Sequence, residues 1–550
     1  MFSKTVFIKN RAWIVFIGII VLAIFLRFWQ LGAIPEGFHV DEASLGYNAY
    51  SLMKTGRDEY GAVMPLIMRG FNDYRAAIYS YITIPFIYVA GLNEWSVRAP
   101  TAIFGILFIF LTYAFVYRIS KNRVLALLSM ALAAISPLGI LLSRVQSDPL
   151  VCFVIFYAAV YCWFLWVEKR TIWYLCLFIL GILVSFYTYT GIRLFALPFL
   201  LLIAAWYWRT FEKRSKIAFA ALFLIVFLFV GVLFFSPTGA RFSQISVFST
   251  MNVQLPLDEE IREDQHQPML VTRVLHNKVT AYGRFFLKNF TDYLSFPFLF
   301  SQASQPQREQ IPNMGVLLLI ECPFLLIGIY TAIRKKLPYG MFSILWFLLV
   351  PAVMSFASEE TPNIHRFFLA MIPIHLLVAL GVLTTVQSIR ARYRSMLILG
   401  IFILFALNIF YFIHELFVHQ PMHTPIYRNE PDKELAMYLK SASSSYDVIV
   451  SQKILEDMLF YWPIEPAVYQ REGSPRDTDD AWYRNFLFVP DACPSLLLNP
   501  TVASLKASHI LYVDKPVCPL AKDDVIIKTI KYRNTLDAYY LIEKRKTVNN

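Results

Sequence analysis

Two adjacent carboxylates, Asp41 and Glu42, are the residues whose type and position most clearly suggest chemistry. They stand shortly after the first long apolar segment, residues 12–31. Because carboxylates are costly inside a bilayer, an acidic pair just outside one is either the start of a helix or a working site. Residues 43–56 predict a short amphipathic helix, so Asp41 lies at or near its N-terminus. There it either caps the helix or acts as a general base.

A second candidate acid, Asp148, directly precedes Pro149 at the start of another apolar segment. Proline is common in the first turn of a helix, so Asp148 either caps that helix or is available for chemistry. Arg144, shortly before it, either pairs with Asp148 or binds lipid head groups.

Two arginines, Arg193 and Arg366, each begin an apolar segment. A cation at a helix N-terminus opposes the helix dipole, so each arginine calls for an anionic partner. A lipid phosphate would suit the planar, bidentate guanidinium, and a salt bridge to a nearby acid is the alternative. His365, next to Arg366, could donate to a phosphate, protonate a leaving group or be a plain interface residue.

The elements that must position these residues are predicted to be membrane helices. The 550 residues are 57% hydrophobic and only 16% charged, with a positive mean hydropathy. A soluble domain has about 25% charged residues. Several runs of roughly 20 apolar residues therefore predict an all-α polytopic membrane protein. The net charge of +12 does not predict nucleic-acid binding, because the Lys and Arg residues lie in short loops between apolar runs.

The sequence predicts about eleven transmembrane helices plus juxtamembrane helices. The first is retained, because no signal-peptide cleavage site follows it. The predicted spans are 12–32, 96–118, 122–142, 149–167, 171–189, 192–208, 216–236, 314–333, 339–357, 366–387 and 395–414. Residues 76–91 are short for a span, rich in tyrosine and interrupted by Pro85, so they predict a helix lying in the membrane interface.

The charge pattern predicts which side each loop occupies. With a cytoplasmic N-terminus every inner loop is basic, as the positive-inside rule requires. The outer side then holds 33–95, the short segment 143–148, the turn near 190, 237–313, the short segment 358–365 and everything after 415, and the candidate residues fall on this face. Most of 237–313 is expected to be solvated surface. A transporter more often places polar groups near the middle of its spans, whereas the predicted spans here are free of polar groups at that depth. The layout favours an active site at the outer membrane surface.

Residues 415–550 predict a small extracytoplasmic α/β domain that follows a membrane domain at 1–414. Apolar spans stop and alternation begins, with expected helices at 432–442 and 454–461 and expected strands at 447–451, 509–513, 525–531 and 538–542. Cys493 and Cys518 are the only cysteines beyond the last predicted span, and an oxidising compartment predicts a disulfide between them.

Four stretches of this chain resemble the bacterial C-type glycosyltransferases, which are integral-membrane enzymes related to the protein O-mannosyltransferases and the aminoarabinose transferases of lipid A. The stretches are residues 41–56, 93–100, 187–193 and 361–366. The resemblance covers roughly residues 10–410 and leaves out the C-terminal domain. It implies a polyprenyl-phosphate-linked sugar donor, an inverting transfer and catalysis on the non-cytoplasmic face of the plasma membrane.

The resemblance also implies roles for the candidate residues. Asp41 would be the catalytic base, Glu42 would orient it or contact the acceptor, and Asp148 would occupy the place of a second outer-loop acid. The expected substrate-binding residues are Arg193, Arg366, His365, Tyr189 and Lys54. The acceptor would be a hydroxyl of a protein, a lipid or a glycan.

No cofactor is expected, and a divalent metal ion held by His39, Asp41 and Glu42 is the alternative. The expected partners are the lipid-linked donor, the acceptor and the lipid bilayer, with no nucleic acid. Two other functions compete with a glycosyltransferase: a transporter or flippase of lipid-linked sugars, and a membrane-anchored scaffold protein. A scaffold would not explain why two arginines begin outer helix ends.

Overall fold

The structure is a computed structural model. It describes residues 2–70, 74–235, 246–248, 251–302, 306–423, 425–452, 454–475, 481–489, 492–496 and 504–545. The chain divides into two compact units. Unit 1 comprises residues 1–29 and 101–415, and unit 2 comprises residues 30–100 and 416–550. The first long loop therefore groups with the C-terminal residues, which the sequence did not indicate. The predicted domain limits, 1–414 and 415–550, stay a prediction.

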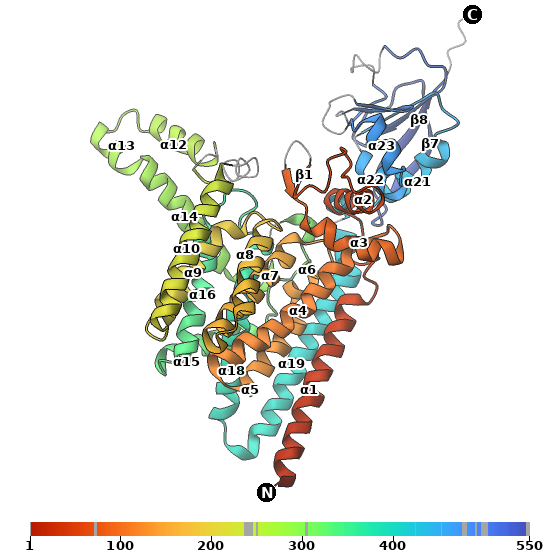
Figure 1. The fold of residues 1–550 in the computed structure, drawn as a ribbon. Coiled ribbons are helices and arrows are strands. Elements are labelled where there is room, and N and C mark those ends of the chain that lie inside the picture. Colours follow the sequence, from red (N-terminus) through yellow and green to blue (C-terminus); the bar gives the residue numbers. More distant parts are fainter. Residues whose placement is uncertain are drawn as a thin grey trace, which may run out of the picture. The chain divides into compact units, whose positions relative to one another are not determined.

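Unit 1 consists of apolar helices and their connections (Figure 1). Its long helices are α1 (Phe2–Phe28), α4 (Glu94–Ser120, which begins in unit 2), α5 (Arg123–Ile135), α6 (Pro137–Leu142), α7 (Asp148–Lys169), α8 (Ile172–Phe186), α9 (Ile192–Tyr207), α10 (Lys213–Phe234), α15 (Glu321–Arg334), α16 (Pro338–Met354), α18 (Met371–Ser388) and α19 (Arg394–His414). Shorter elements complete it: α12 (Met251–Glu263), α13 (Met269–Leu275), α14 (Lys278–Leu294), η1 (Pro297–Ser301), η2 (Gln307–Glu309), α17 (Ile364–Phe367), η3 (Phe368–Ala370) and η4 (Ala391–Tyr393). Each predicted span coincides with one or more of these helices.

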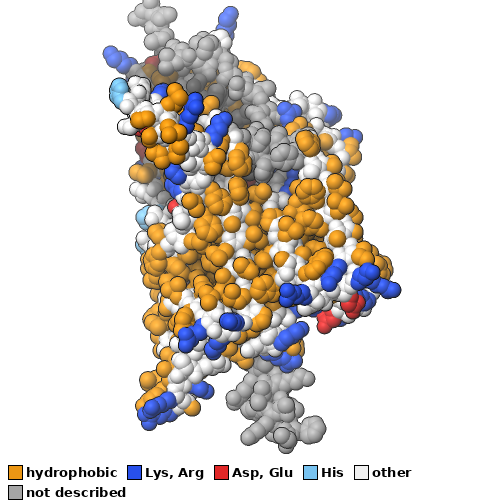
Figure 2. All heavy atoms as spheres, turned by 90° about the vertical axis from the view of Figure 1, so that its left-hand side faces the viewer, with side chains coloured by type: hydrophobic (Ala, Val, Ile, Leu, Met, Phe, Trp, Pro, Cys, Tyr) orange, Lys and Arg blue, Asp and Glu red, His pale blue; other side chains and the backbone are white. Residues whose placement is uncertain are grey.

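Within the described residues, five helical stretches are long and apolar enough to cross a bilayer. They are Glu94–Ser120, Asp148–Lys169, Lys213–Leu233, Ile364–Ser388 and Ala391–His423. Figure 2 shows a largely hydrophobic face, with Lys and Arg side chains gathered at the lower end of the hydrophobic band. The chain is a multi-pass membrane protein, as predicted, while the number of eleven spans stays a prediction.

Helix α18, which follows the short helix containing His365 and Arg366, packs closely against α15. α18 crosses α15 at Gly328 and Gly381. A Cβ at Gly328 would lie 1.8 Å from the carbonyl oxygen of Leu377, and a Cβ at Gly381 would lie 1.9 Å from that of Phe324. Small residues let the two backbones meet, as is common between membrane helices.

The expectation that the spans are clean of polar groups was wrong. Arg27 in α1, Glu321 in α15 and His375 in α18 are fully buried. Arg27 donates to the backbone carbonyls of Ala133 and Ala134 of α5, at 3.3 and 3.0 Å. Each of these residues stands among apolar neighbours, so a scan for apolar runs passes over it. Buried ionisable groups often mark transport paths, so the composition of the spans is no longer an argument against a transporter.

Unit 2 contains the helix predicted after Asp41. This helix, α2 (Val40–Thr55), ends at Gly56, whose φ of +67° suits glycine. The expectation of one apolar side was too narrow, because residues around the whole helix are buried. Three helices pack against it: α3 (Ile78–Ala90), α22 (Leu455–Tyr461) and α23 (Pro466–Glu472). The 13 residues of α3 span about 20 Å, too short to cross a bilayer and in keeping with an interfacial helix.

The rest of unit 2 is built on a six-stranded sheet of order β4-β5-β3-β6-β8-β7. β3 pairs in parallel with β5 and β6, and the remaining pairs are antiparallel. The strands are β3 (Val448–Gln452), β4 (Ala481–Tyr483), β5 (Phe486–Val489), β6 (Ile510–Asp514), β7 (Asp524–Lys531) and β8 (Asp537–Lys544), and β1 (Ile67–Arg69) pairs separately with β2 (Tyr74–Ala76). Further helical turns are η5 (Glu415–His419), α20 (Gln420–His423), η6 (Pro425–Arg428) and α21 (Asp432–Ala442).

The predicted elements of the C-terminal region are confirmed. The two expected helices correspond to α21 and α22, and the four expected strands to β3, β6, β7 and β8. The short elements α23, β4 and β5 were missed. The predicted disulfide is also confirmed: Cys493 and Cys518 are bonded, with their Cα atoms 5.4 Å apart.

Candidate active site

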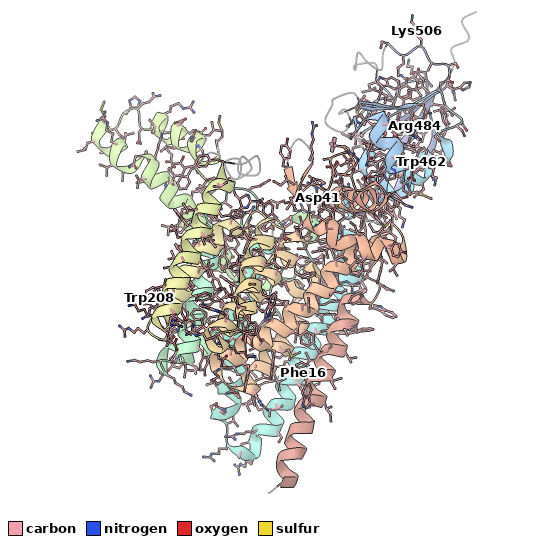
Figure 3. All side chains as sticks on the ribbon, viewed as in Figure 1. Phe16, Asp41, Trp208, Trp462, Arg484 and Lys506 are labelled. Carbon is pink, nitrogen blue, oxygen red and sulfur yellow. A yellow bond between two sulfur atoms is a disulfide. The ribbon has the colours of Figure 1, made fainter. Side chains whose placement is uncertain are left out.

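Asp41 does not cap its helix. The N-cap residue of α2 is His39, whose Nδ1 accepts a hydrogen bond from the Asp41 backbone N–H at 3.2 Å. The Glu42 carboxylate completes a capping box by accepting from the His39 N–H at 3.2 Å. The capping alternative for Asp41 is therefore wrong, and its position at the start of α2 (Figure 3) needs another explanation.

The Asp41 carboxylate is accessible and oriented. Its side chain is 33% exposed, and Oδ1 lies 2.6 Å from Nη2 of Arg75 in β2. Oδ2 lies 3.4 Å from Nδ1 of His39. The sequence placed Arg75 in the first outer loop but gave no sign that it would meet Asp41.

Glu42 is held very differently from its neighbour. It is only 2% exposed, and it accepts hydrogen bonds from two buried guanidinium groups. Arg98 donates through Nε to Oε1 at 3.0 Å and through Nη2 to Oε2 at 3.1 Å. Arg428 donates to Oε2 at 2.8 Å. With both oxygens engaged, the geometry favours a structural role for Glu42 over contact with an acceptor.

Lys54 lies far from Asp41 along the same helix. It is exposed in the last turn of α2, and its Nζ lies 5.8 Å from the ring centroid of Tyr50. At 1.5 Å of rise per residue, Asp41 and Lys54 are separated by about 20 Å. Lys54, a predicted substrate-binding residue, therefore does not lie near the Asp41 carboxylate.

Asp148 is not the cap of α7 either. The N-cap is Ser147, whose Oγ accepts from the Leu150 N–H at 3.4 Å. Asp148 is half-buried, and its carboxylate accepts a hydrogen bond from the Gln146 side-chain amide. The capping alternative therefore belongs to Ser147, and Asp148 stays a candidate for chemistry.

Arg144 has a structural task at the end of another helix. It is fully buried and donates to the carbonyl oxygens of Leu26 at 2.8 Å and Trp29 at 2.6 Å. These carbonyls lie where α1 ends and has no further helical N–H to bond. Full burial excludes the expectation that Arg144 binds lipid head groups.

Arg366 is a nearly buried cation, 8% exposed, in α17. Asn363 begins this short helix by accepting the Arg366 backbone N–H at 3.1 Å. The guanidinium donates to the carbonyl oxygen of Glu359 at 2.8 Å, and the side chains of Tyr189 and Tyr293 lie close to it. The Glu359 carbonyl orients this cation near the N-terminal end of α7, where the ring of Tyr189 packs against Phe153.

Arg193 begins α9 and bonds to the helix before it. Its Nε and Nη2 donate to the carbonyl oxygen of Phe186, at 3.3 and 3.0 Å. Phe186 is the last residue of α8, so Arg193 satisfies a carbonyl that the helix leaves without a partner. Cys152 of α7 lies within electrostatic reach of both Arg193 and Asp148, which places both at the same end of α7.

His365 is not a plain interface residue. It is 8% exposed, and its Nε2 lies against the carboxylate of Glu309. Its Nδ1 lies 3.3 Å from the Ser147 Oγ. Glu309 was missed because it lies in the long outer loop expected to be solvated surface, and nothing in that loop distinguishes it from its acidic neighbours.

The structure thus gathers five of the predicted site residues within unit 1. They surround the N-terminal end of α7 and are Asp148, Tyr189, Arg193, His365 and Arg366. The other three, Asp41, Glu42 and Lys54, lie in unit 2. Among the described residues, His39, Asp41 and Glu42 do not bring three ligand atoms within reach of one metal ion.

Three comparisons place this geometry among known proteins. A family model described as dolichyl-phosphate-mannose-protein mannosyltransferase matches residues 75–234, which include Asp148, Tyr189 and Arg193. A search of curated protein sequences finds no match.

Two crystal structures of ArnT from Cupriavidus metallidurans share the fold. The apo form matches with a TM-score of 0.52 at 12% identity and covers 97% of this chain and 98% of that chain. The form bound to undecaprenyl phosphate matches with a TM-score of 0.50 at 12% identity and covers 96% and 97%. The family-model match and the shared fold together confirm that this chain resembles the polytopic C-type glycosyltransferases, as its sequence indicated.

Proposed function

We propose that this protein transfers a sugar from a polyprenyl-phosphate-linked donor to an acceptor hydroxyl at the outer face of the plasma membrane, with inversion. The acceptor hydroxyl attacks the anomeric carbon as the bond from that carbon to the phosphate oxygen breaks. Asp41 takes the hydroxyl proton, and the polyprenyl phosphate leaves as a stable anion. One base suffices, because the leaving group needs no second residue to depart.

The observation that carries this proposal is the oriented cation at the outer end of α7. Arg366 is nearly buried, yet it begins an apolar helix where the helix dipole opposes its charge. The guanidinium donates a hydrogen bond to the carbonyl oxygen of Glu359, and Tyr189 and Tyr293 lie close to it. A phosphate could bind this cation through charge-assisted hydrogen bonds.

The relatives support a lipid-phosphate donor. One of the ArnT structures is bound to undecaprenyl phosphate, and the matched family model is named for a dolichyl-phosphate-linked mannose donor. Both compounds are polyprenyl phosphates, which supports a donor of this class. We assign no particular sugar or acceptor.

The outer location rests on the chain's own chemistry. The Cys493–Cys518 disulfide suits an oxidising compartment, and it lies in the region predicted to be extracytoplasmic. The predicted inner loops carry the basic residues. We therefore place unit 2 outside the plasma membrane.

A transporter or flippase of lipid-linked sugars is the second candidate. The observation in its favour is the pair of fully buried ionisable side chains Arg27 and His375 in membrane helices. Such groups are a hallmark of transport paths. Arg27, however, already donates to backbone carbonyls of α5, which gives it a structural task.

The test is a transfer assay on protein reconstituted in nanodiscs. A panel of radiolabelled polyprenyl-phosphate sugars is offered together with membrane extract as the acceptor source. We expect release of free polyprenyl phosphate and a labelled product, both lost in Asp41→Asn. No release from any donor, together with movement of a fluorescent lipid-linked sugar across proteoliposomes, would establish the transporter instead.

A further inference from the structure

Three side chains that can bind a metal ion lie close together at the end of α19, and the proposed reaction uses none of them. They are His414, Glu415 and His419. One ligand atom from each residue lies within 4.8 Å of the ligand atoms of the other two. All three stand on one continuous helical stretch, Ala391–His423, at the point where α19 passes into η5.

A π-helical turn brings the two histidines together. η5 is a π-helix, in which backbone N–H groups bond to carbonyls five residues earlier. In an α-helix, residues five apart point about 140° away from each other, so His414 and His419 would lie on different sides. The wider turn instead returns His419 toward His414. Because π-helical turns are rare and occur mostly at functional sites, this turn is a second sign of a site here.

Glu415 is the buried member of the cluster. Its side chain is 3% exposed, and nothing in the described part of the chain hydrogen-bonds to its Oε2. A buried carboxylate oxygen without a donor is costly. Tyr411, one turn earlier, also lies close to this carboxylate. A cation bound beside Oε2 would remove the cost of burying it.

The cluster can be reached from solvent, and its atoms select the kind of ion. His414 is exposed and His419 half-buried, so an ion can pass from the surface to the buried carboxylate. Two imidazoles and one carboxylate suit Zn²⁺, and three protein ligands leave a fourth position for water. Ca²⁺ and Mg²⁺ prefer ligand sets made of oxygen alone.

We propose that His414, Glu415 and His419 bind one Zn²⁺ ion. The ion would hold the π-helical turn at the end of α19 and stabilise the folded chain there, because the unfolded chain does not keep the three ligands together. The inference does not depend on the proposed function, since none of the three residues has a part in sugar transfer.

The experiment measures zinc binding by the full-length protein in nanodiscs. The protein is purified without a polyhistidine tag, stripped of metal with EDTA and dialysed against Zn²⁺. Mass spectrometry of the retained metal gives the stoichiometry, and the visible absorption of bound Co²⁺ reports the ligand set. We expect one Zn²⁺ per chain, an unfolding midpoint that rises with Zn²⁺ concentration, and no competition from an excess of Ca²⁺ or Mg²⁺.

Two variants each remove one ligand. His414→Ala and Glu415→Gln should each weaken zinc binding by more than roughly 100-fold, since loss of an outer-shell partner alone costs about 10–100-fold. His423→Ala is the matched control. Its ring stacks near that of His419, with centroids 6.1 Å apart, but it does not belong to the cluster. His423→Ala should keep the wild-type affinity.

Loss of binding is separated from misfolding by the exposed ligand. Because the His414 side chain is exposed, His414→Ala should leave the unfolding midpoint of the metal-free protein unchanged, and this variant decides the matter if Glu415→Gln does not fold. A wild-type protein that retains no stoichiometric zinc would overturn the proposal. Stoichiometric zinc that folded His414→Ala binds as tightly as the wild-type protein would also overturn it, because the ion would then lie elsewhere.

Discussion

Arg98 and Glu42 form a buried, two-point ion pair, with Nε to Oε1 at 3.0 Å and Nη2 to Oε2 at 3.1 Å. Arg428, from the C-terminal part of the chain, donates to the same carboxylate. The adjacent Asp41 is 33% exposed and paired with Arg75. The two neighbouring acids therefore differ in role: Glu42 is buried and holds two arginines, whereas the Asp41 carboxylate is accessible.

Glu42→Ala should destabilise the protein strongly. It would leave Arg98 and Arg428 buried beside each other without their anion, at a cost on the order of 3–5 kcal/mol. Thermal unfolding in detergent measures the loss. Asp41→Asn, one residue earlier on the same helix, is the control and should unfold close to the wild-type midpoint. Equal thermal-unfolding midpoints for Glu42→Ala and the wild-type protein would contradict a stabilising role for Glu42.

Asp41→Asn should instead abolish transfer. The amide keeps the shape of the side chain but cannot take a proton, so we expect a rate loss of roughly 100-fold or more. Single-turnover release of polyprenyl phosphate measures it. Near wild-type turnover in folded Asp41→Asn would remove Asp41 from the mechanism.

Much of the fold could be predicted because its signals are local. Runs of apolar residues indicated the membrane helices, and alternation indicated β3 and β6. The burial of α2 could not be predicted, because α22 and α23, which pack against it, lie some 400 residues further along the chain. Local sequence records periodicity but not which distant segment will cover a helix.

The same distinction between local and distant signals explains which residues of the candidate site could be proposed from the sequence. Asp41 and Arg366 were found because a charge beside an apolar run is conspicuous. Glu309, Arg75 and Arg428 were missed because their importance comes from a partner far along the chain. Arg27 and His375 were missed for a local reason. Each is a single ionisable residue among apolar neighbours, so the segment still reads as an apolar run.

Arg366→Ala and Arg193→Ala should both weaken donor binding more than Arg144→Ala. Each charge-assisted contact to a phosphate contributes on the order of 1.5–3 kcal/mol, whereas Arg144 is fully buried against carbonyls of the α1 end. The apparent KM for the donor in nanodiscs gives the comparison. Arg144→Ala should lower the unfolding midpoint and leave KM unchanged. Unchanged KM in both Arg366→Ala and Arg193→Ala would assign these residues to structural pairing.

The stability of unit 2 should fall as pH rises. Burial raises the pKa of Asp432 to about 6, and burial together with the nearby Asp432 raises the pKa of Asp457 well above its ordinary value. Because the folded state holds these protons more tightly than the unfolded chain, the stabilisation is complete below about pH 4 and is lost as pH rises through about 6. A rise of the Asp432 pKa from 3.8 to about 6 corresponds to a change on the order of 3 kcal/mol, and hydrogen exchange in α21 and α22, corrected for intrinsic rates, measures it.

Asp432→Asn should flatten this pH dependence, since the amide resembles the protonated carboxyl that burial favours. Asp447 is the control: it is exposed, and hydrogen bonds from Ser508 and His509 lower its pKa. Its contribution has the opposite sign and is lost as pH falls, so Asp447→Asn should not flatten the decline. A decline as steep in Asp432→Asn as in wild type would exclude Asp432 as its source.

Loss of the Cys493–Cys518 disulfide should destabilise unit 2 and leave the helices of unit 1 intact. The bond closes a loop with a sequence separation of 25, and the chain-entropy model gives about 3 kcal/mol for a loop of this length. Cys493→Ser with Cys518→Ser should therefore increase hydrogen exchange in β3 and β6, while exchange in α7 and α18 stays at the wild-type level. Non-reducing peptide mapping of protein isolated from membranes provides the companion measurement. Free thiols at both positions would contradict the bond and, with it, the placement of residues 416–550 in an oxidising compartment.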